Sequence, residues 1–172
     1  MPENRGIAIV LDVSLSMGKP YGDLVPSKLA AVVEAVAFFG RRALESGACV
    51  SLAVFHENAV PILPPTRSYK DFIEALSEIT RTYEGSSLGD GIIWGVKLLR
   101  QHRGQKMLVA ITDGEVTGGV PVKLALAYAR ASRVDSRILL IGDEAIHEAP
   151  LEIVRRVKSK EDLARALGEL LT

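Results

Sequence analysis

Asp12, Ser14 and Ser16 place one carboxylate and two hydroxyls at alternate positions, directly after the first hydrophobic run of the chain, residues 6–11. In an extended segment the side chains of residues i, i+2 and i+4 lie on one side, so these oxygens can converge on one point. Oxygen ligands of this kind suit hard cations such as Mg²⁺. The segment is not a phosphate-binding P-loop, because no Gly-x-x-x-x-Gly-Lys-Ser/Thr pattern follows it.

Two more polar segments are expected at the same edge of the fold. Asp113 follows the hydrophobic run of residues 106–112, a position equivalent to that of Asp12 after the first run. Ser86 lies in a Glu-Gly-Ser-Ser loop that precedes a helical pattern. Two carboxylates brought together would repel each other and raise a pKa unless a cation separated them. The residues therefore give a physical reason for a metal ion.

Hydrophobic strand-like runs alternate with helical patterns along the chain. The predicted strands cover residues 6–11, 49–56, 106–112 and 137–141, and a short partner strand covers 59–63 before two prolines end it. The predicted helices cover residues 27–44, 70–79, 87–100, 121–131 and 159–170. The predicted N-caps include Ser27, Ser159 and Ser87, and Asp90 would complete a capping box with Ser87.

The core strands are nearly continuous hydrophobic runs, which predicts a parallel sheet with helices on both faces. The alternating order predicts an α/β fold of the doubly wound, Rossmann-like kind: a mostly parallel central sheet flanked by helices, with one short antiparallel edge strand. The length of 172 residues, 48% of them hydrophobic, fits one core. We expect a single domain over residues 1–172, with its ligand site beyond the carboxyl ends of the strands.

The charge balance limits the kinds of partner. The 21 basic and 21 acidic residues cancel to a net charge of zero, so no overall field attracts nucleic acid or an anionic membrane. No hydrophobic stretch reaches the roughly 20 residues that span a bilayer, and the polar residues 2–5 are unlike a signal peptide. Cys49 is the single cysteine, which suits a reducing compartment. We expect a cytoplasmic protein that binds neither nucleic acid nor membrane.

Three segments together resemble the metal-ion-dependent adhesion site (MIDAS) of the von Willebrand factor A (VWA) domains. They are Asp-x-Ser-x-Ser at residues 12–16, Gly-Ser at 85–86, where the family usually has Thr after Gly, and Thr-Asp-Gly at 112–114. The resemblance covers nearly the whole chain and is to the intracellular prokaryotic type. It implies that Ser14, Ser16 and Ser86 bind the metal directly or nearly so, while Asp12 and Asp113 act largely through water.

The resemblance also implies a function. Neutral hydroxyl ligands leave most of the cation's positive charge unneutralised. An open coordination position on the metal therefore favours the carboxylate of an Asp or Glu of a partner protein. Mg²⁺ is the first choice by ligand hardness, and Mn²⁺ can substitute for it. The chain then looks like a non-enzymatic protein-protein interaction module, with an AAA+ ATPase as the candidate machine beside which it works.

Other interpretations stay open. An Asp after the first strand also suits a Mg²⁺-dependent phosphohydrolase that uses Asp12 as nucleophile, although Ser14 occupies the place of the acid-base Asp in such enzymes. Ser14 and Ser16 could instead hydrogen-bond the loop backbone, and Asp113 could belong to an ordinary turn. The basic run at residues 155–158 is expected on or beside a helix, as a solvated face.

Overall fold

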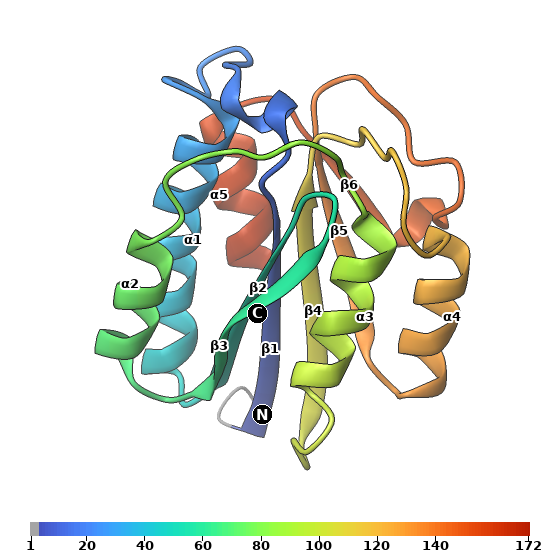
Figure 1. Ribbon diagram of the computed structural model, residues 1–172. Coiled ribbons are helices and arrows are strands. Elements are labelled where there is room, and N and C mark those ends of the chain that lie inside the picture. The colour runs from blue at the N-terminus through green and yellow to red at the C-terminus, as the bar shows by residue number, and fades with distance from the viewer. Residues whose placement is uncertain (1–3) are drawn as a thin grey trace.

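The computed structural model describes residues 4–172, which form a six-stranded sheet covered by helices on both faces (Figure 1). The first part of the polar start, residues 1–3, lies outside the described residues. The strands are β1 (Arg5–Asp12), β2 (Cys49–Phe55), β3 (Ala59–Thr66), β4 (Gln105–Thr112), β5 (Asp135–Ile141) and β6 (Val154–Val157). The helices are α1 (Lys28–Glu45), α2 (Tyr69–Ser77), α3 (Leu88–Leu98), α4 (Val122–Ala131) and α5 (Lys160–Glu169), with short 3-10 helices η2 (Leu15–Gly18) and η3 (Leu151–Ile153).

The strand order β3-β2-β1-β4-β5-β6 is that of a doubly wound sheet. β1 pairs in parallel with both β2 and β4, whereas β3 pairs antiparallel with β2. The order reverses between β1 and β4, and their register sets Leu11 beside Ile111. The carboxyl ends of these two strands therefore lie side by side at the switch point, where such folds bind ligands. The predicted fold class is confirmed.

Two hydrophobic layers hold the helices to the sheet. The alternation along β1 sends Ile7, Ile9 and Leu11 into the layer under α1, α2 and α5. Ala8 and Val10 pack in the opposite layer, under α3 and α4. Because both faces of β1 are buried in this way, its carboxyl end is held rigidly from both sides.

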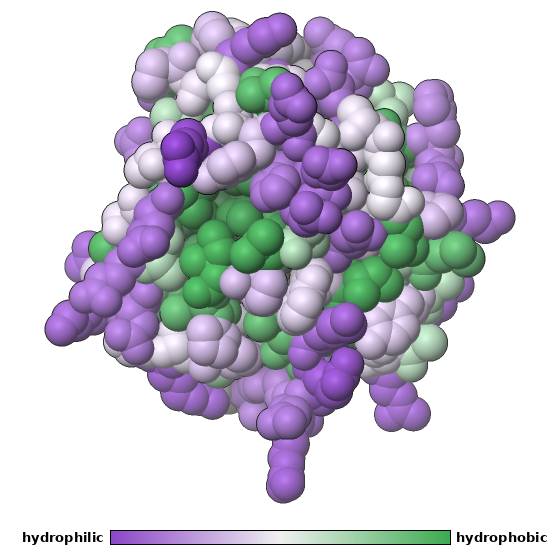
Figure 2. Space-filling model, in the orientation of Figure 1, coloured by the Kyte–Doolittle hydropathy of each residue, from purple (hydrophilic) through white to green (hydrophobic). Residues whose placement is uncertain are grey.

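Both edge strands depart from the sequence prediction. β3 continues through Pro64 and Pro65 to Thr66, so the prediction that the prolines end it is wrong. An edge strand tolerates proline, which has no backbone N–H, because on its outer side there is no neighbouring strand to which an N–H must donate. Figure 2 shows hydrophobic side chains gathered around β3, between α2 and α3. At the other edge, Arg155 and Arg156 lie in β6, a strand that the sequence analysis missed in favour of a basic run on or beside a helix.

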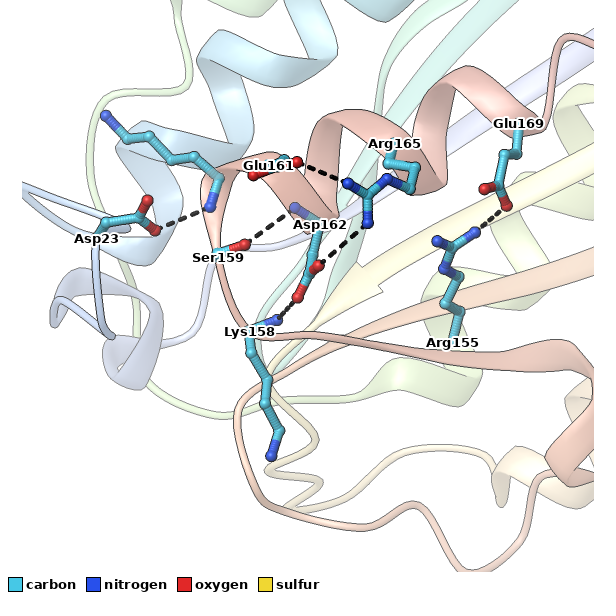
Figure 3. A network of polar contacts seen from close by, with 9 residues as sticks. Asp23, Arg155, Lys158, Ser159, Glu161, Asp162, Arg165 and Glu169 are labelled. Atoms are coloured by element: carbon cyan, nitrogen blue, oxygen red, sulfur yellow. Dashed lines mark hydrogen bonds and ion pairs between the residues drawn. The ribbon is translucent and has the colours of Figure 1, made fainter.

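The helix caps at Ser27 and Ser159 are confirmed, since each hydroxyl accepts a backbone N–H three residues on. The start of α5 is also tied to the loop after η2, because Asp23 Oδ1 accepts from Lys160 N at 2.8 Å (Figure 3). Within the described part of the chain, every helix falls short of the combined length and hydrophobicity that a membrane span requires.

Candidate metal centre

Asp12 is the last residue of β1, and its side chain is completely buried. Oδ1 accepts a hydrogen bond from the backbone N–H of Ser14 at 2.8 Å. Oδ2 accepts one from the hydroxyl of Thr112, at the end of β4, at 2.6 Å. The carboxylate is thus held in one orientation between the two central strands. Sequence reasoning missed the role of Thr112, although Thr directly before Asp113 was a visible signal.

The hydroxyl groups of Ser14 and Ser16 are brought together by a helical turn of the chain. Ser14 is extended, but η2 begins at Leu15, so the predicted strand-like alternation ends at Ser14 and does not reach Ser16. The two hydroxyl oxygens nevertheless lie 3.2 Å apart. Ser14 is buried and Ser16 half-buried. The pair presents two neutral oxygens beside the Asp12 carboxylate.

Ser86 comes from a loop that is fastened to both other segments. Its backbone N–H donates to Thr117 Oγ1, and its carbonyl accepts from Thr117 N, both at 2.8 Å. On the other side, Tyr83 N donates to Val13 O at 2.8 Å. Figure 1 shows the loops after β1, before α3 and after β4 at the same end of the sheet. Ser86 is 1% exposed, and within residues 4–172 its Oγ has no hydrogen-bond partner.

The Gly-Ser loop requires its glycine. Gly85 has φ +84°, and a Cβ there would lie 2.8 Å from Cα of Glu57. Any larger residue would strain the backbone and push the loop away from β2. The glycine therefore allows the Gly-Ser loop to approach Glu57, in the turn after β2, closely.

Ser87 and Asp90 do not form the predicted capping box. Ser87 Oγ donates to the carbonyls of His56 and Glu57, at 2.7 and 3.0 Å. Asp90 Oδ1 accepts from the backbone N–H of Val120 at 2.8 Å. The prediction is wrong because long-range contacts compete for both side chains. Their role is to fasten the start of α3 to the loops on either side of it.

Asp113 is buried at the end of β4, one residue beyond Thr112, and is 4% exposed. Its Oδ2 lies 3.0 Å from Nζ of Lys28, the first residue of α1, and its Oδ1 accepts weakly from Glu115 N at 3.4 Å. The side chain of Glu115 is exposed. Sequence reasoning missed Lys28, for which no pattern in the sequence gave a signal.

At the carboxyl edge of the sheet, the negative charges of Asp12 and Asp113 are not fully balanced by positive charge. Burial raises the pKa of the Asp12 carboxyl to about 6, and the negative charge of Asp113 adds to the rise, while hydrogen bonds from Ser14 and Thr112 oppose it. A divalent cation would remove this penalty, because opposite charge favours the ionised carboxylate. The free energy of ionising Asp12 therefore favours a cation at this edge.

The donor set can be tested against a metal ion. The five predicted residues lie at the carboxyl edge in three joined loops, and they offer two carboxylates and three hydroxyls, all oxygen donors that suit Mg²⁺. Of these five side chains, that of Ser86 most needs a ligand, because its buried Oγ has no hydrogen-bond partner among the residues that the structure describes. Within residues 4–172 no three His, Cys, Asp or Glu side chains cluster as metal ligands. A metal here would therefore depend on the serine hydroxyls, and the residues fit one.

A doubly wound sheet with this oxygen-rich switch point defines a class of α/β ligand-binding domains. The family model of the von Willebrand factor type A domain matches residues 7–115, and the chain belongs to this family. The match contains all five residues of the candidate site. No curated protein matches the chain significantly.

Solved structures share the fold at low sequence identity. An aerotolerance-related membrane protein from Bacteroides fragilis is 20% identical, with a TM-score of 0.75 over 96% of this chain and 98% of that one. The SpRpn10 VWA domain is 18% identical, with a TM-score of 0.72 over 96% of this chain and 94% of that one. Proximal thread matrix protein 1 from the mussel byssus, with a zinc-occupied MIDAS motif, is 15% identical, with a TM-score of 0.75 over 98% of this chain and 47% of that one.

Proposed function

We propose that the chain, as a single domain over residues 1–172, is a metal-dependent protein interaction module. In this proposal the carboxyl edge of the sheet holds Mg²⁺, with Mn²⁺ able to replace it, and the ion binds an Asp or Glu side chain of a partner protein. The proposed ligands, direct or through water, are Asp12, Ser14, Ser16, Ser86 and Asp113.

The observation that carries the proposal is the buried hydroxyl of Ser86, whose Oγ has no hydrogen-bond partner within residues 4–172. An unsatisfied buried polar group costs about 1–3 kcal/mol. The loop that holds Ser86 is nevertheless fastened by hydrogen bonds through Tyr83 and Thr117. Ser51 and Ser136 also have buried hydroxyls without a partner within residues 4–172, so this cost alone does not point to a ligand. Ser86 differs from them because its loop is fastened beside the buried Asp12 and Asp113, where a divalent cation would meet the need of its hydroxyl.

The surroundings of the site support a protein partner. A bound divalent ion would supply positive charge and an open position for an incoming carboxylate. Leu15, between the two serines, is 53% exposed, and Val116, after the Asp113 turn, is 42% exposed. These apolar side chains on the site loops suit a partner whose acidic residue is flanked by apolar ones.

We also propose a location and a partner class. The proposed partner is an AAA+ ATPase with an accessible Asp or Glu, and the proposed location is the cytoplasm. The single cysteine, Cys49, which has no second cysteine with which to form a disulfide within the chain, is compatible with this compartment.

The alternative function is a Mg²⁺-dependent phosphohydrolase with Asp12 as nucleophile, and the geometry does not favour it. Asp12 is 0% exposed, and both of its oxygens accept short hydrogen bonds from Ser14 N and Thr112. A nucleophile needs one oxygen aligned with an incoming phosphorus. Mg²⁺-dependent turnover of a generic aryl phosphate that is lost in Asp12→Asn would establish the enzyme instead.

The test of the interaction module has two stages. Isothermal titration with MgCl₂ and MnCl₂ should give binding to the wild-type protein that Asp12→Ala weakens by about 100-fold. The immobilised protein should then capture a partner from source lysate with Mg²⁺ and release it with EDTA, while immobilised Asp12→Ala captures none. Equal capture by both proteins, or capture that EDTA does not reverse, would contradict the proposal.

A further inference from the structure

Lys28 and Asp113 form an ion pair unlike the others in the molecule. Nζ of Lys28 lies 3.0 Å from Oδ2 of Asp113, and the side chains are 14% and 4% exposed. In each of the other six ion pairs within residues 4–172, both side chains are at least 39% exposed. Solvent screens those pairs strongly and screens this one much less. The Lys28 ammonium therefore contributes substantially to the charge of the candidate site.

The position of Lys28 is unfavourable for its own helix. It is the first residue of α1, whose first turn contains no acidic residue. The positive end of the helix dipole lies there, so a cation is locally disfavoured. Its backbone is fixed, since Lys28 N donates to Lys19 O at 2.8 Å and the helix is capped by Ser27. A residue that breaks a local preference in a well-ordered position usually has a role elsewhere.

That role follows from the charges at the edge of the sheet. Asp12 and Asp113 bring two carboxylates together, and the negative charge of Asp113 helps to raise the pKa of Asp12. The ammonium of Lys28 lies against one of these carboxylates, on the end of a flexible four-carbon stem. A divalent ion that uses Asp113, directly or through water, must share its oxygens with Lys28 or displace it.

We propose that Lys28 is an intrinsic cation of the site that competes with the divalent ion for Asp113. It balances the buried carboxylates when no divalent ion is bound, and its ammonium leaves Asp113 when one binds. It thereby weakens metal binding and makes the site readily reversible. This inference rests on the proposed function, because it concerns the same metal site.

The experiment compares divalent-ion affinities of matched variants. Lys28→Met keeps the length of the side chain and removes its charge. Lys19→Met removes an equal charge from an exposed lysine in the segment that leads from η2 to α1. Titration of the EDTA-stripped and dialysed proteins with MnCl₂ and MgCl₂ should show roughly five- to tenfold tighter binding for Lys28→Met, the range expected when a partly buried charge competitor is removed. Lys19→Met should change the affinity by less than about twofold, because its charge is screened.

A second measurement uses stability. In EDTA, Lys28→Met should melt at a lower temperature than the wild type, because two buried carboxylates lose their counter-ion, and saturating Mg²⁺ should close the gap. Lys28→Gln, which retains a hydrogen-bond donor without the charge, should behave as Lys28→Met does and provides a second variant if Lys28→Met does not fold.

The outcomes separate this inference from the proposed function. If the wild type binds the ions in an Asp12-dependent way but both Lys28 variants bind no more tightly, or Lys19→Met tightens binding equally, competition by Lys28 is overturned and the metal site stands. If neither the wild type nor any Lys28 variant binds either ion, the metal site and this inference fall together.

Discussion

Two polar regions of the molecule differ in how completely their polar groups are satisfied. At the start of α5 the side chains are mostly exposed and well paired: Ser159 caps the helix, Asp162 accepts from Lys158 N, and Arg165 lies against Glu161 (Figure 3). At the carboxyl edge of the sheet, Asp12 and Asp113 are buried together, and the hydroxyl of Ser86 lacks a partner within residues 4–172.

The two regions differ because water reaches the polar groups of the first and not those of the second. Water and flexible neighbours satisfy exposed groups at almost any geometry, so such a network adds little to stability. Buried groups depend on fixed partners, and each missing partner has a cost. The carboxyl edge maintains such a cost in a rigid frame, which distinguishes a ligand site from a surface network.

The largest effect is expected from Asp12→Ala. Loss of this carboxylate should weaken Mg²⁺ binding by about 100-fold, in line with the loss of groups that orient or support metal ligands. The fold should remain, because Asp12 is a strand-end side chain outside the hydrophobic layers. Isothermal titration measures the affinity and circular dichroism the fold. An unfolded variant would mean that Asp12 is chiefly structural.

A pH effect on stability should come next in size. Burial raises the pKa of Asp12 from its ordinary value of 3.8 to about 6, so the folded protein binds this proton more tightly than the unfolded chain does. The contribution to stability is therefore full below pH 4 and is lost as the pH rises through about 6, a change on the order of 2–3 kcal/mol.

This change can be isolated with Asp12→Asn. Urea unfolding in EDTA at several pH values should show that the stability of the variant relative to the wild type increases between pH 4 and pH 7. Saturating Mg²⁺ should restore the wild type at pH 7 and leave the variant unaffected. A constant difference between the two proteins across this pH range would contradict the buried-charge account.

Ser86→Ala should separate binding from stability. We expect about tenfold weaker Mg²⁺ binding. The unfolding free energy should be unchanged or slightly higher, because the hydroxyl makes no hydrogen bond to any described residue that the substitution would remove. Ser51→Ala is the matched control, since Ser51 Oγ on β2 is also buried without a partner within residues 4–172. It should not alter Mg²⁺ affinity. Ser86→Thr should retain or tighten binding. Unchanged affinity in Ser86→Ala would remove Ser86 from the site.

The smallest effect is expected in the exposed network. Arg165→Ala removes the i,i+4 pair with Glu161, whose side chains are 54% and 79% exposed. The loss of unfolding free energy should be about 0.3–0.5 kcal/mol, with no change in Mg²⁺ affinity. Chemical denaturation measures the first and titration the second. A loss of several kcal/mol would show that exposure does not separate the two regions as argued.

Much of the fold could be predicted because it follows from local patterns. The continuous hydrophobic runs of β1, β2, β4 and β5 predict buried parallel strands, and their alternation with helices predicts the doubly wound order. At the edges, β3 was predicted as an antiparallel edge strand but with too early an end, and β6 was missed. β6 is an edge strand that pairs with β5. Because it contains Arg155 and Arg156, it lacks the continuous hydrophobic run that identifies a central strand in the sequence.

The candidate site was predictable to the extent that its residues follow strand ends. Asp12 and Asp113 come directly after hydrophobic runs, and parallel strands set such positions at one edge. The actual roles of Ser87 and Asp90 were not predictable in this way. Both sit where a cap is expected, but bonds to the end of β2 and to Val120, about thirty residues away in each case, outcompete the local ones.

The amino-acid sequence by itself determined which strands are buried, that they run in parallel, and that oxygen-bearing side chains follow two of them, because periodicity and composition act over short stretches of chain. The tertiary structure alone decided that Thr112 orients Asp12, that the buried hydroxyl of Ser86 has no partner within residues 4–172, and that Lys28 pairs with Asp113. These facts depend on contacts between residues that are far apart in the chain, and packing of the whole fold determines which of the possible contacts form.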